Sequence, residues 1–207
     1  MKFIHKDFFY NYRLAFGKLR QSQVNGIAAL LKFIEQDTGW DMLRKDVTIK
    51  QIAYMLATVK HECADTWQPI EEYGKGKGKE YGKVIEIRCN GHKKKVAFYG
   101  RGYVQTTWKD NYRRMSERYD FDPNPMSNSD NELVCNPDLA TEPDNAYILL
   151  SEGMREGLYT GKKLSDYINS NKCDYFHARR IINRLDKAKL IEGYAQKLAM
   201  VLVQSYG

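Results

Sequence analysis

The feature that most limits the fold is a spacing of three to four residues between apolar side chains, which recurs along the chain. Val24, Ile27 and Ile34, for example, fall on one side of a helix. Ser22 and Thr48 suit the N-terminal caps of the first two such segments. The spacing predicts helices over residues 22–38, 48–62, 107–119, 144–156 and 190–201. A mainly α-helical fold is therefore expected.

One β signal stands among these helices. The pair Asn90-Gly91 lies between two β-rich runs, residues 84–88 and 96–99, and this pattern is typical of a β-hairpin. Other segments are less regular. We expect a helix or an irregular flap over residues 1–21, a loop over 121–143 and short helices over 164–168 and 176–183.

Length and charge narrow the class of protein. A chain of 207 residues can form one well-buried core, so a single domain over residues 1–207 is expected, without a separate wall-binding domain. The net charge of +7 favours polyanionic partners, such as nucleic acid, an anionic membrane surface or a cell-wall polymer. Charged residues interrupt the apolar start of the chain, so no secretory signal peptide is expected, and no segment has the length of a membrane span.

Cysteine and histidine spacing argues against a metal site. No two cysteines form a Cys-x-x-Cys pair, and we expect reduced thiols at all four positions. His61 and Glu62 begin like the zinc motif His-Glu-x-x-His, but Asp65 occupies the position of the second histidine. No metal or other cofactor is therefore expected. The cysteines are Cys63, Cys89, Cys135 and Cys173.

Glu62 has an unusual position in the helical pattern. Met55, Leu56 and Val59 form an apolar stripe, and three further residues bring that stripe to Glu62. Burial raises the pKa of a carboxyl group, which is what a general acid needs near neutral pH. The alternative is a structural glutamate bonded to an arginine or to a backbone amide, and the position alone favours neither interpretation.

A second acidic site follows ten residues later. Glu71 and Glu72 precede a loop of alternating glycine and lysine, residues 74–79, which does not have the spacing of a phosphate-binding loop. Glycoside hydrolysis requires one protonated carboxyl for the leaving oxygen and one ionised carboxyl that activates water or attacks the sugar. Two acids in different surroundings can fill these roles.

Several of these residues also resemble a known family. The chain is similar to the glycoside hydrolase family 19 chitinases and, more closely, to their phage endolysin relatives, over most of its length. The signature Tyr-Gly-Arg-Gly-x-x-Gln-x-Thr is specific, whereas an isolated His-Glu pair is weak. The matching stretches are His61-Glu62, residues 68–72, residues 98–107 and Asn111-Tyr112.

This resemblance implies a lysozyme-like α+β fold in which the hairpin lies beside the active-site cleft. It also implies an inverting mechanism in which Glu62 is the general acid and Glu72 the general base, with Glu71 as the alternative base. Thr107 would help to hold the attacking water. The residues expected to bind substrate or to shape its cleft are Gln105, Asn111, Asn183, His61, Tyr103 and Arg101, the last two through the shape of their loop.

The chain departs from the family pattern at three positions. Cys63 replaces the usual threonine or serine after the catalytic glutamate, and Thr106 stands where leucine is common. Arg184 follows Asn183 where glycine is usual, which weakens the assignment of Asn183.

The resemblance leaves two substrates, chitin and the glycan of bacterial peptidoglycan. A small, basic chain without a signal peptide suggests a monomeric endolysin that accumulates in the host bacterial cytoplasm. It would reach the peptidoglycan strands, and anionic wall or outer-membrane surfaces, after the membrane is permeabilised. Muramidase-type cleavage is the first expectation and chitinase activity the second. A non-catalytic protein that binds cell wall or nucleic acid remains a third alternative.

Overall fold

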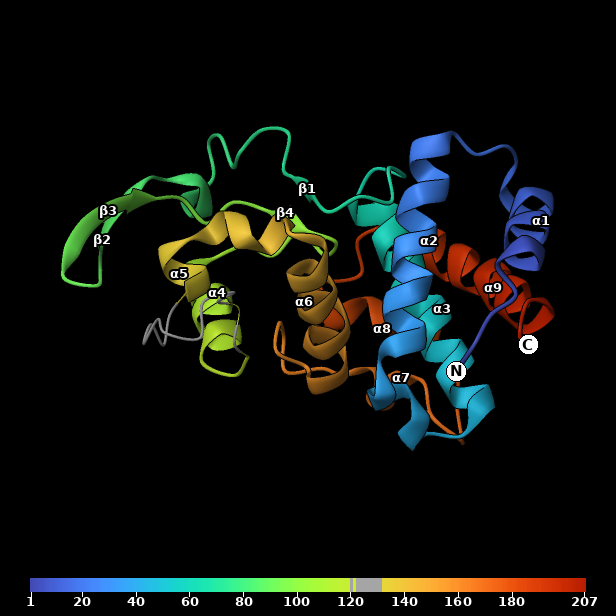
Figure 1. Cartoon of the computed structure of the whole chain (residues 1–207). Helices are drawn as coiled ribbons and strands as arrows, with labels where there is room; N and C mark the ends of the chain where they lie inside the picture. Colours follow the sequence, from blue (N-terminus) through green and yellow to red (C-terminus); the bar gives the residue numbers. More distant parts are fainter. Residues whose placement is uncertain (120, 122–131) are drawn as a thin grey trace. The chain divides into compact units, whose positions relative to one another are not determined.

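A computed structural model describes residues 1–119, 121 and 132–207 of the chain. These residues form two compact units, one made of Met1–Trp67 with Met154–Gly207 and the other of Gln68–Gly153. The fold is mainly α-helical, as the sequence predicts, and it has two small antiparallel sheets where one hairpin was expected (Figure 1). The expected single-domain organisation stays a prediction.

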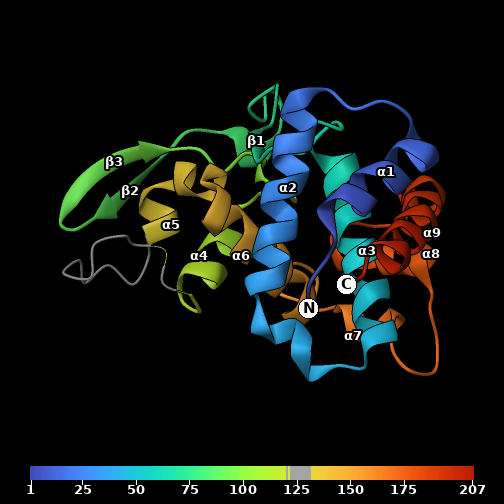
Figure 2. The same cartoon turned by 45° about the vertical axis from the view of Figure 1, so that its right-hand side comes forward.

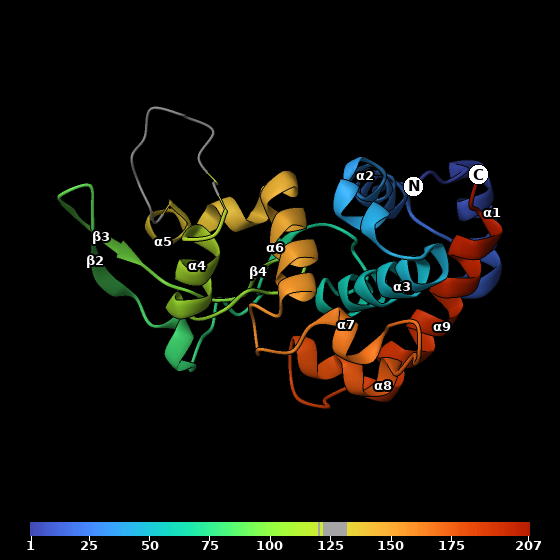
Figure 3. The ribbon, with the colours of Figure 1, turned by 90° about the horizontal axis from the view of Figure 1, so that it is seen from below.

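The first unit is helical throughout. Its central helix is α3 (Lys45–Glu62), whose residues are buried from Val47 to Lys60 apart from Lys50. A helix that is buried on all sides lies inside a core, and α3 packs against α9 (Figure 3). The other elements of the unit are α1 (His5–Phe16), α2 (Gln21–Gln36), η1 (Thr38–Met42), α7 (Leu164–Tyr167), α8 (Tyr175–Ala178), η4 (Arg179–Ile181) and α9 (Ala188–Gln204).

The two ends of the chain meet in this unit. Phe3 forms an antiparallel bridge with Tyr206, and Ile4 N donates to Ser205 O at 2.7 Å. Figure 2 shows the N- and C-termini on the same side, with α1 beside α9. Residues 5–16 are thus a helix rather than an irregular flap, and Gly17 ends it with a φ of +90°, a conformation that favours glycine.

The helices begin earlier than their expected caps. α2 starts at Gln21, so Ser22 lies inside it, and α3 starts at Lys45, so Thr48 lies in its first turn. The predicted caps at Ser22 and Thr48 are wrong. The Thr48 hydroxyl is buried and lies 3.2 Å from the Arg44 carbonyl oxygen, one turn back. A hydroxyl can find that acceptor inside a helix, so a Thr-x-x-Gln pattern does not fix where a helix starts.

The second unit holds both sheets. β1 (Ile70–Glu71) pairs with β4 (Arg101–Gly102), which places Glu71 opposite Arg101. β2 (Ile85–Cys89) pairs with β3 (His92–Val96), which places Cys89 opposite His92. The remaining elements are η2 (Glu80–Gly82), α4 (Lys109–Ser116), α5 (Glu132–Cys135), η3 (Pro137–Thr141) and α6 (Pro143–Glu156), whose last three residues belong to the first unit.

The β2–β3 pair confirms the predicted hairpin. Asn90 and Gly91 both have positive φ, 49° and 81°, as a tight two-residue turn requires. The second strand runs over residues 92–96 rather than 96–99, because the turn pairs Cys89 directly with His92. Turn geometry therefore sets the register, although this strand carries three consecutive lysines.

The cysteine prediction is wrong for one pair. Cys89, at the end of β2, forms a disulfide with Cys135, at the end of α5. Their Cα atoms lie 5.7 Å apart although 46 residues separate them in the sequence. Sequence spacing could not show this proximity, because it arises from the packing of α5 near β2. Cys63 and Cys173 are not part of this disulfide, and the first is buried and the second exposed.

Several element boundaries also differ from expectation. α4 is shorter than the expected 107–119 helix, since Trp108 precedes it and is 52% exposed. The expected loop contains α5 and η3, while its residues 122–131 lie outside the described residues. Helix α6, followed by Gly157, is confirmed, and the expected 176–183 helix is divided into α8 and η4. No helix in the described part of the chain is long and apolar enough to cross a membrane.

Candidate active site

The candidate acid, Glu62, is the last residue of α3. Its side chain is 17% exposed, and Oε1 accepts a hydrogen bond from Arg179 Nη1 at 2.6 Å. Among the described residues, no hydrogen bond reaches the second oxygen, Oε2. Glu62 therefore has one anchored carboxylate oxygen and one that is available to a ligand or a proton.

Arg179 is positioned by the chain around it. Its side chain is only 2% exposed, and Nε donates to Asp186 O at 3.0 Å. Burial and the C-terminal helix dipole both disfavour a negative charge at Glu62, and the guanidinium offsets them. If Glu62 is a structural residue, the sequence analysis expects it to bind an arginine or a backbone amide. The contact with Arg179 agrees with that interpretation. The catalytic interpretation requires the free Oε2.

His61 lies half-buried next to Glu62. Burial lowers the pKa of His61 below its ordinary value, while the charge of Glu62 acts in the opposite direction. The positive charges of Arg179 and Lys187 add to the lowering. The imidazole is therefore neutral at pH 7, so it can act there as a hydrogen-bonding group but not as a cation.

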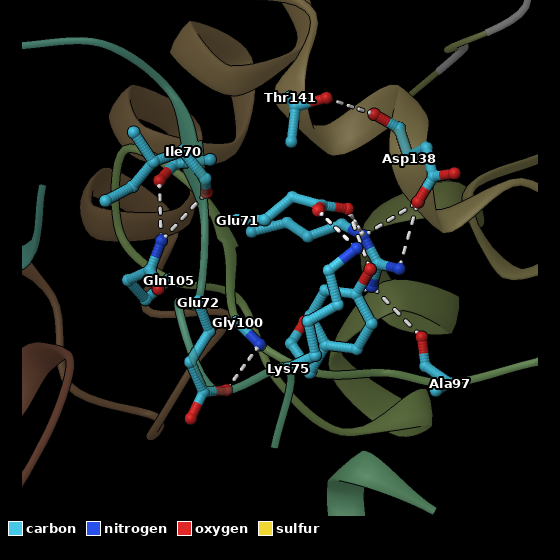
Figure 4. Close-up of polar contacts among 12 residues, drawn as sticks. Ile70, Glu71, Glu72, Lys75, Ala97, Gly100, Gln105, Asp138 and Thr141 are labelled. Atoms are coloured by element: carbon cyan, nitrogen blue, oxygen red, sulfur yellow. Dashed lines mark hydrogen bonds and ion pairs between the residues drawn. The ribbon is translucent and has the colours of Figure 1, made fainter. Parts of the chain in front are cut away.

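The second candidate carboxyl, Glu72, follows β1 in the other unit. Its Oε2 accepts from Gly100 N at 3.1 Å (Figure 4). Its Oε1 accepts from the Tyr81 hydroxyl at 3.2 Å. Burial, followed by the charge of Glu72, raises the pKa of Tyr81, so its phenol remains a proton donor. Glu72 is thus oriented by two neutral donors.

Its neighbour Glu71 has a different environment. Tyr99 donates to Oε1 at 2.7 Å, Lys75 Nζ lies 3.0 Å from Oε2, and Arg101 Nε lies 3.7 Å from Oε1. The hydrogen bond from Tyr99, followed by the one from Lys75, holds the pKa of the Glu71 carboxyl below its usual value. Glu71 is therefore a carboxylate enclosed by cations.

Two glycines, Gly100 and Gly102, lie close to neighbouring residues in the segment that follows β3. A Cβ on Gly100 would lie 2.8 Å from Gln105 Oε1, and one on Gly102 would lie 2.6 Å from Ala140 O. Gly102 also has a φ of +79°. A side chain is therefore excluded at Gly102, whereas at Gly100 the nearest atom is the far end of the flexible Gln105 side chain.

The predicted cleft residues of this unit lie along the same loop. Gln105 Nε2 donates to Ile70 O at 3.0 Å, which fastens the loop to β1 (Figure 4). Asn111 Nδ2 donates to Thr107 O at 2.9 Å. The Thr107 hydroxyl forms no hydrogen bond with a described residue and is half-buried. It is therefore free to bind water.

Thr107 is connected to Glu72 through aromatic side chains. The Tyr81 hydroxyl binds Glu72, and the Tyr81 ring packs edge-on against Trp108 with centroids 5.6 Å apart. Trp108 follows Thr107 directly and donates its backbone N–H to Phe98 O at 3.0 Å. Through these contacts, Thr107 and Glu72 are connected within the second unit.

Arg101 and Tyr103 are buried, with 4% and 1% of their surfaces exposed. The Arg101 guanidinium binds Asp138 at 2.9 Å and Ala97 O at 3.0 Å, and it stacks over the Tyr99 ring. These contacts agree with a role in shaping the loop rather than in touching a ligand.

Asn183 lies in the first unit and is exposed. Its Oδ1 accepts a hydrogen bond from Arg184 N at 2.8 Å, so half of its amide is used locally. It lines a pocket of about 650 Å³ together with Arg180 and Arg184. The predicted position of Asn183 at a ligand-accessible surface is therefore compatible with the structure.

The structure gathers Glu62 and His61 in the first unit, and Glu71, Glu72 and the loop of residues 98–111 in the second. Sequence reasoning missed Arg179 and Tyr81. A signal existed for Arg179, because a buried glutamate requires a cationic partner and Arg179 stands in the apolar stretch that ends at Ile182. No sequence signal marked Tyr81.

No group of three or more His, Cys, Asp and Glu side chains within residues 1–119, 121 and 132–207 could hold a metal ion. Comparison of the chain with known proteins also gives no assignment. No protein-family model, curated protein sequence or solved structure matches it significantly.

Proposed function

We propose that this chain is an endolysin that hydrolyses β-1,4-glycosidic bonds of bacterial peptidoglycan by acid/base catalysis with inversion. Glu62 is the general acid and Glu72 the general base. The resemblance to family 19 glycoside hydrolases implies the same two roles.

The observation that supports it is a contrast between two half-buried carboxyl groups. Glu62 is anchored by a buried arginine through one oxygen and leaves the other free, whereas Glu72 is oriented by neutral donors. Different surroundings are what allow two carboxyls to take opposite roles in one reaction.

Glu72 is a better base than Glu71. The hydrogen bond from Tyr99, followed by the contacts with Lys75 and Arg101, lowers the pKa of the Glu71 carboxyl, which weakens it as a proton acceptor. Within the described part of the chain, Glu72 has no cation among its hydrogen-bond partners. Its oxygens can accept a proton from water without first breaking an ion pair.

The reaction then proceeds in one displacement. Glu62 takes up a proton on Oε2, the oxygen that Arg179 does not bind, and donates it to the glycosidic oxygen, and the bond from that oxygen to the anomeric carbon breaks. Water, held by the Thr107 hydroxyl, attacks the opposite face of this carbon and gives its proton to Glu72. An inverting reaction requires the two carboxyls to be about 6.5–9.5 Å apart in the complex, which leaves room for the water.

The charge of the chain supports an anionic polymer as substrate. With a net charge of +7, the chain is attracted to the carboxylates and phosphates of a bacterial wall, and chitin carries no such charge. The proposed working form is a monomer that reaches the wall from the host cytoplasm after the membrane is permeabilised.

The experiment that tests this function is digestion of purified peptidoglycan and of chitin, with mass spectrometry of the products. New N-acetylmuramic acid reducing ends are expected, which identify muramidase cleavage. N-acetylglucosamine ends from peptidoglycan would change the bond assigned, and cleavage of chitin alone would make the chain a chitinase. Wall binding without new reducing ends would show a binding protein.

A further inference from the structure

The pocket beside Asn183 has an unusual charge. Its lining includes three cations, Lys162, Arg180 and Arg184, and no acidic residue. None of these three side chains forms an ion pair with a residue in the described part of the chain. The other lining residues are Thr160, Ile182, Asn183 and Leu185. We call these seven residues the anion pocket.

Backbone contacts give the anion pocket a fixed frame. Its two segments are joined by the Thr160 hydroxyl, which lies 2.7 Å from Arg180 O. Lys162 N donates in turn to Thr160 Oγ1 at 3.4 Å. The Thr160 hydroxyl therefore links the backbone of Lys162 to the backbone of Arg180.

The frame also connects the anion pocket to the candidate acid. The segment of residues 180–185 starts in η4 and continues as a loop, and the residues that flank it are tied together, since Arg179 Nε donates to Asp186 O at 3.0 Å. The same guanidinium binds Glu62 through Nη1. The position of the pocket relative to Glu62 is thus fixed within the first unit by one buried side chain.

Three unpaired cations around a concave site select a negatively charged group, because a neutral ligand would leave their mutual repulsion in place. Arginine binds planar carboxylates through two parallel hydrogen bonds, which favours Arg180 and Arg184 as ligands of such a group. Glycan strands of peptidoglycan carry peptide branches with free carboxylates on every second sugar, whereas chitin has none.

We propose that the anion pocket binds a carboxylate of the peptide branch while Glu62 donates its proton to the glycosidic oxygen of the same strand. This inference rests on the proposed function, and it names the feature of the substrate that distinguishes a peptidoglycan strand from chitin. Because the three cations are exposed, added salt weakens the contact through screening over about 8 Å at physiological ionic strength.

The test is a binding measurement, so it does not depend on catalysis. Calorimetric titration compares a disaccharide peptide with free carboxylates against the same fragment with all carboxylates amidated. The wild type is expected to bind the first about tenfold more tightly, equivalent to roughly 1.4 kcal/mol. Lys162→Gln combined with Arg184→Gln is expected to abolish this preference.

A control variant removes the same charge elsewhere. Lys18→Gln with Lys32→Gln changes two exposed lysines outside the anion pocket and is expected to keep the preference. Circular dichroism of both double variants verifies the fold. The proposal is overturned if the wild type binds both fragments equally, or if Lys162→Gln with Arg184→Gln keeps the preference.

Further outcomes distinguish a carboxylate ligand from a phosphate ligand, and the anion pocket from the proposed catalysis. Displacement of the carboxylated fragment by glycerol phosphate at a lower concentration than by acetate would overturn the proposal in favour of a phosphate ligand. Cleavage of peptidoglycan without the carboxylate preference would reject the anion pocket alone. The preference without any cleavage would support the pocket and reject the proposed catalysis.

Discussion

Arg179 Nη1 lies 2.6 Å from Glu62 Oε1, and this arginine is almost completely buried. Arg179→Met leaves a half-buried carboxylate without its cation, so we expect a loss of about 2–4 kcal/mol in the free energy of unfolding. Urea denaturation followed by circular dichroism measures it. Adding Glu62→Gln to Arg179→Met should recover part of the loss, because the unpaired charge is then absent.

The control for this prediction is Arg180→Met, one residue along the chain. Arg180 is exposed, so its substitution should change the free energy of unfolding by only about 0.5 kcal/mol. Equal losses in the two variants would show that the Glu62 ion pair contributes nothing of its own.

Substitutions of the neighbouring residues Glu71 and Glu72 should have different effects. We expect Glu72→Gln to reduce the rate of peptidoglycan hydrolysis by about 10²- to 10⁴-fold, because it removes the group that accepts the proton from water. Glu71→Gln should lower stability by about 1–3 kcal/mol, because Lys75 and buried Arg101 lose a partner. Its rate should stay within about tenfold of the wild type.

Parallel rate and unfolding measurements on the two variants distinguish the acids. A rate loss confined to Glu71→Gln would assign the base to Glu71 instead.

The extent to which the sequence predicted this structure follows from the range of each interaction. Apolar spacing within a segment located α2, α3, α6 and α9, and Asn90 with Gly91 located the hairpin, because these signals are local. Helix starts were missed where the cap depends on surrounding backbone, as at Thr48. Local patterns therefore predicted which helices and strands form better than they predicted where each one begins and ends.

Interactions between distant residues could not be predicted in the same way. The partners Cys89 and Cys135 are 46 residues apart, and Glu62 is 117 residues from Arg179. Nothing local in the sequence pairs them. The Glu71 environment was missed for a related reason, since Arg101 reaches it only through the pairing of β1 with β4.

The Cys89–Cys135 disulfide should stabilise the second unit. Closing a loop of this length reduces the entropy of the unfolded chain, and the chain-entropy estimate is about 4 kcal/mol. We expect Cys89→Ser, or treatment with a thiol reductant, to lower the melting temperature measured by calorimetry. Cys173→Ser changes an exposed free thiol and serves as the control. An unchanged melting temperature after verified reduction would contradict the prediction.

Acid stability should depend on Tyr99. The folded pKa of Glu71 is depressed, so its contribution to stability is complete above the unfolded value of about 4.3 and is lost as the pH falls through the folded value. Tyr99→Phe removes the largest cause of the depression. The stability difference between wild type and Tyr99→Phe should therefore be largest at pH 7 and shrink at pH 3.

Chemical denaturation at the two pH values checks the effect of Tyr99. Tyr73→Phe, which changes an exposed tyrosine of the same unit, should give no pH-dependent difference. A Tyr99→Phe difference that grows towards acid would have the wrong sign for this account.

The most direct measurement of the central claim is the rate at which purified Glu62→Gln releases reducing ends from peptidoglycan, compared with the wild type. Glutamine keeps the size of the side chain and can still bond to Arg179, but it has no acidic proton to give. We predict a native circular dichroism spectrum and a rate lower by about 10²- to 10⁴-fold. Wild-type activity in the folded Glu62→Gln variant would contradict the assignment of Glu62 as the acid.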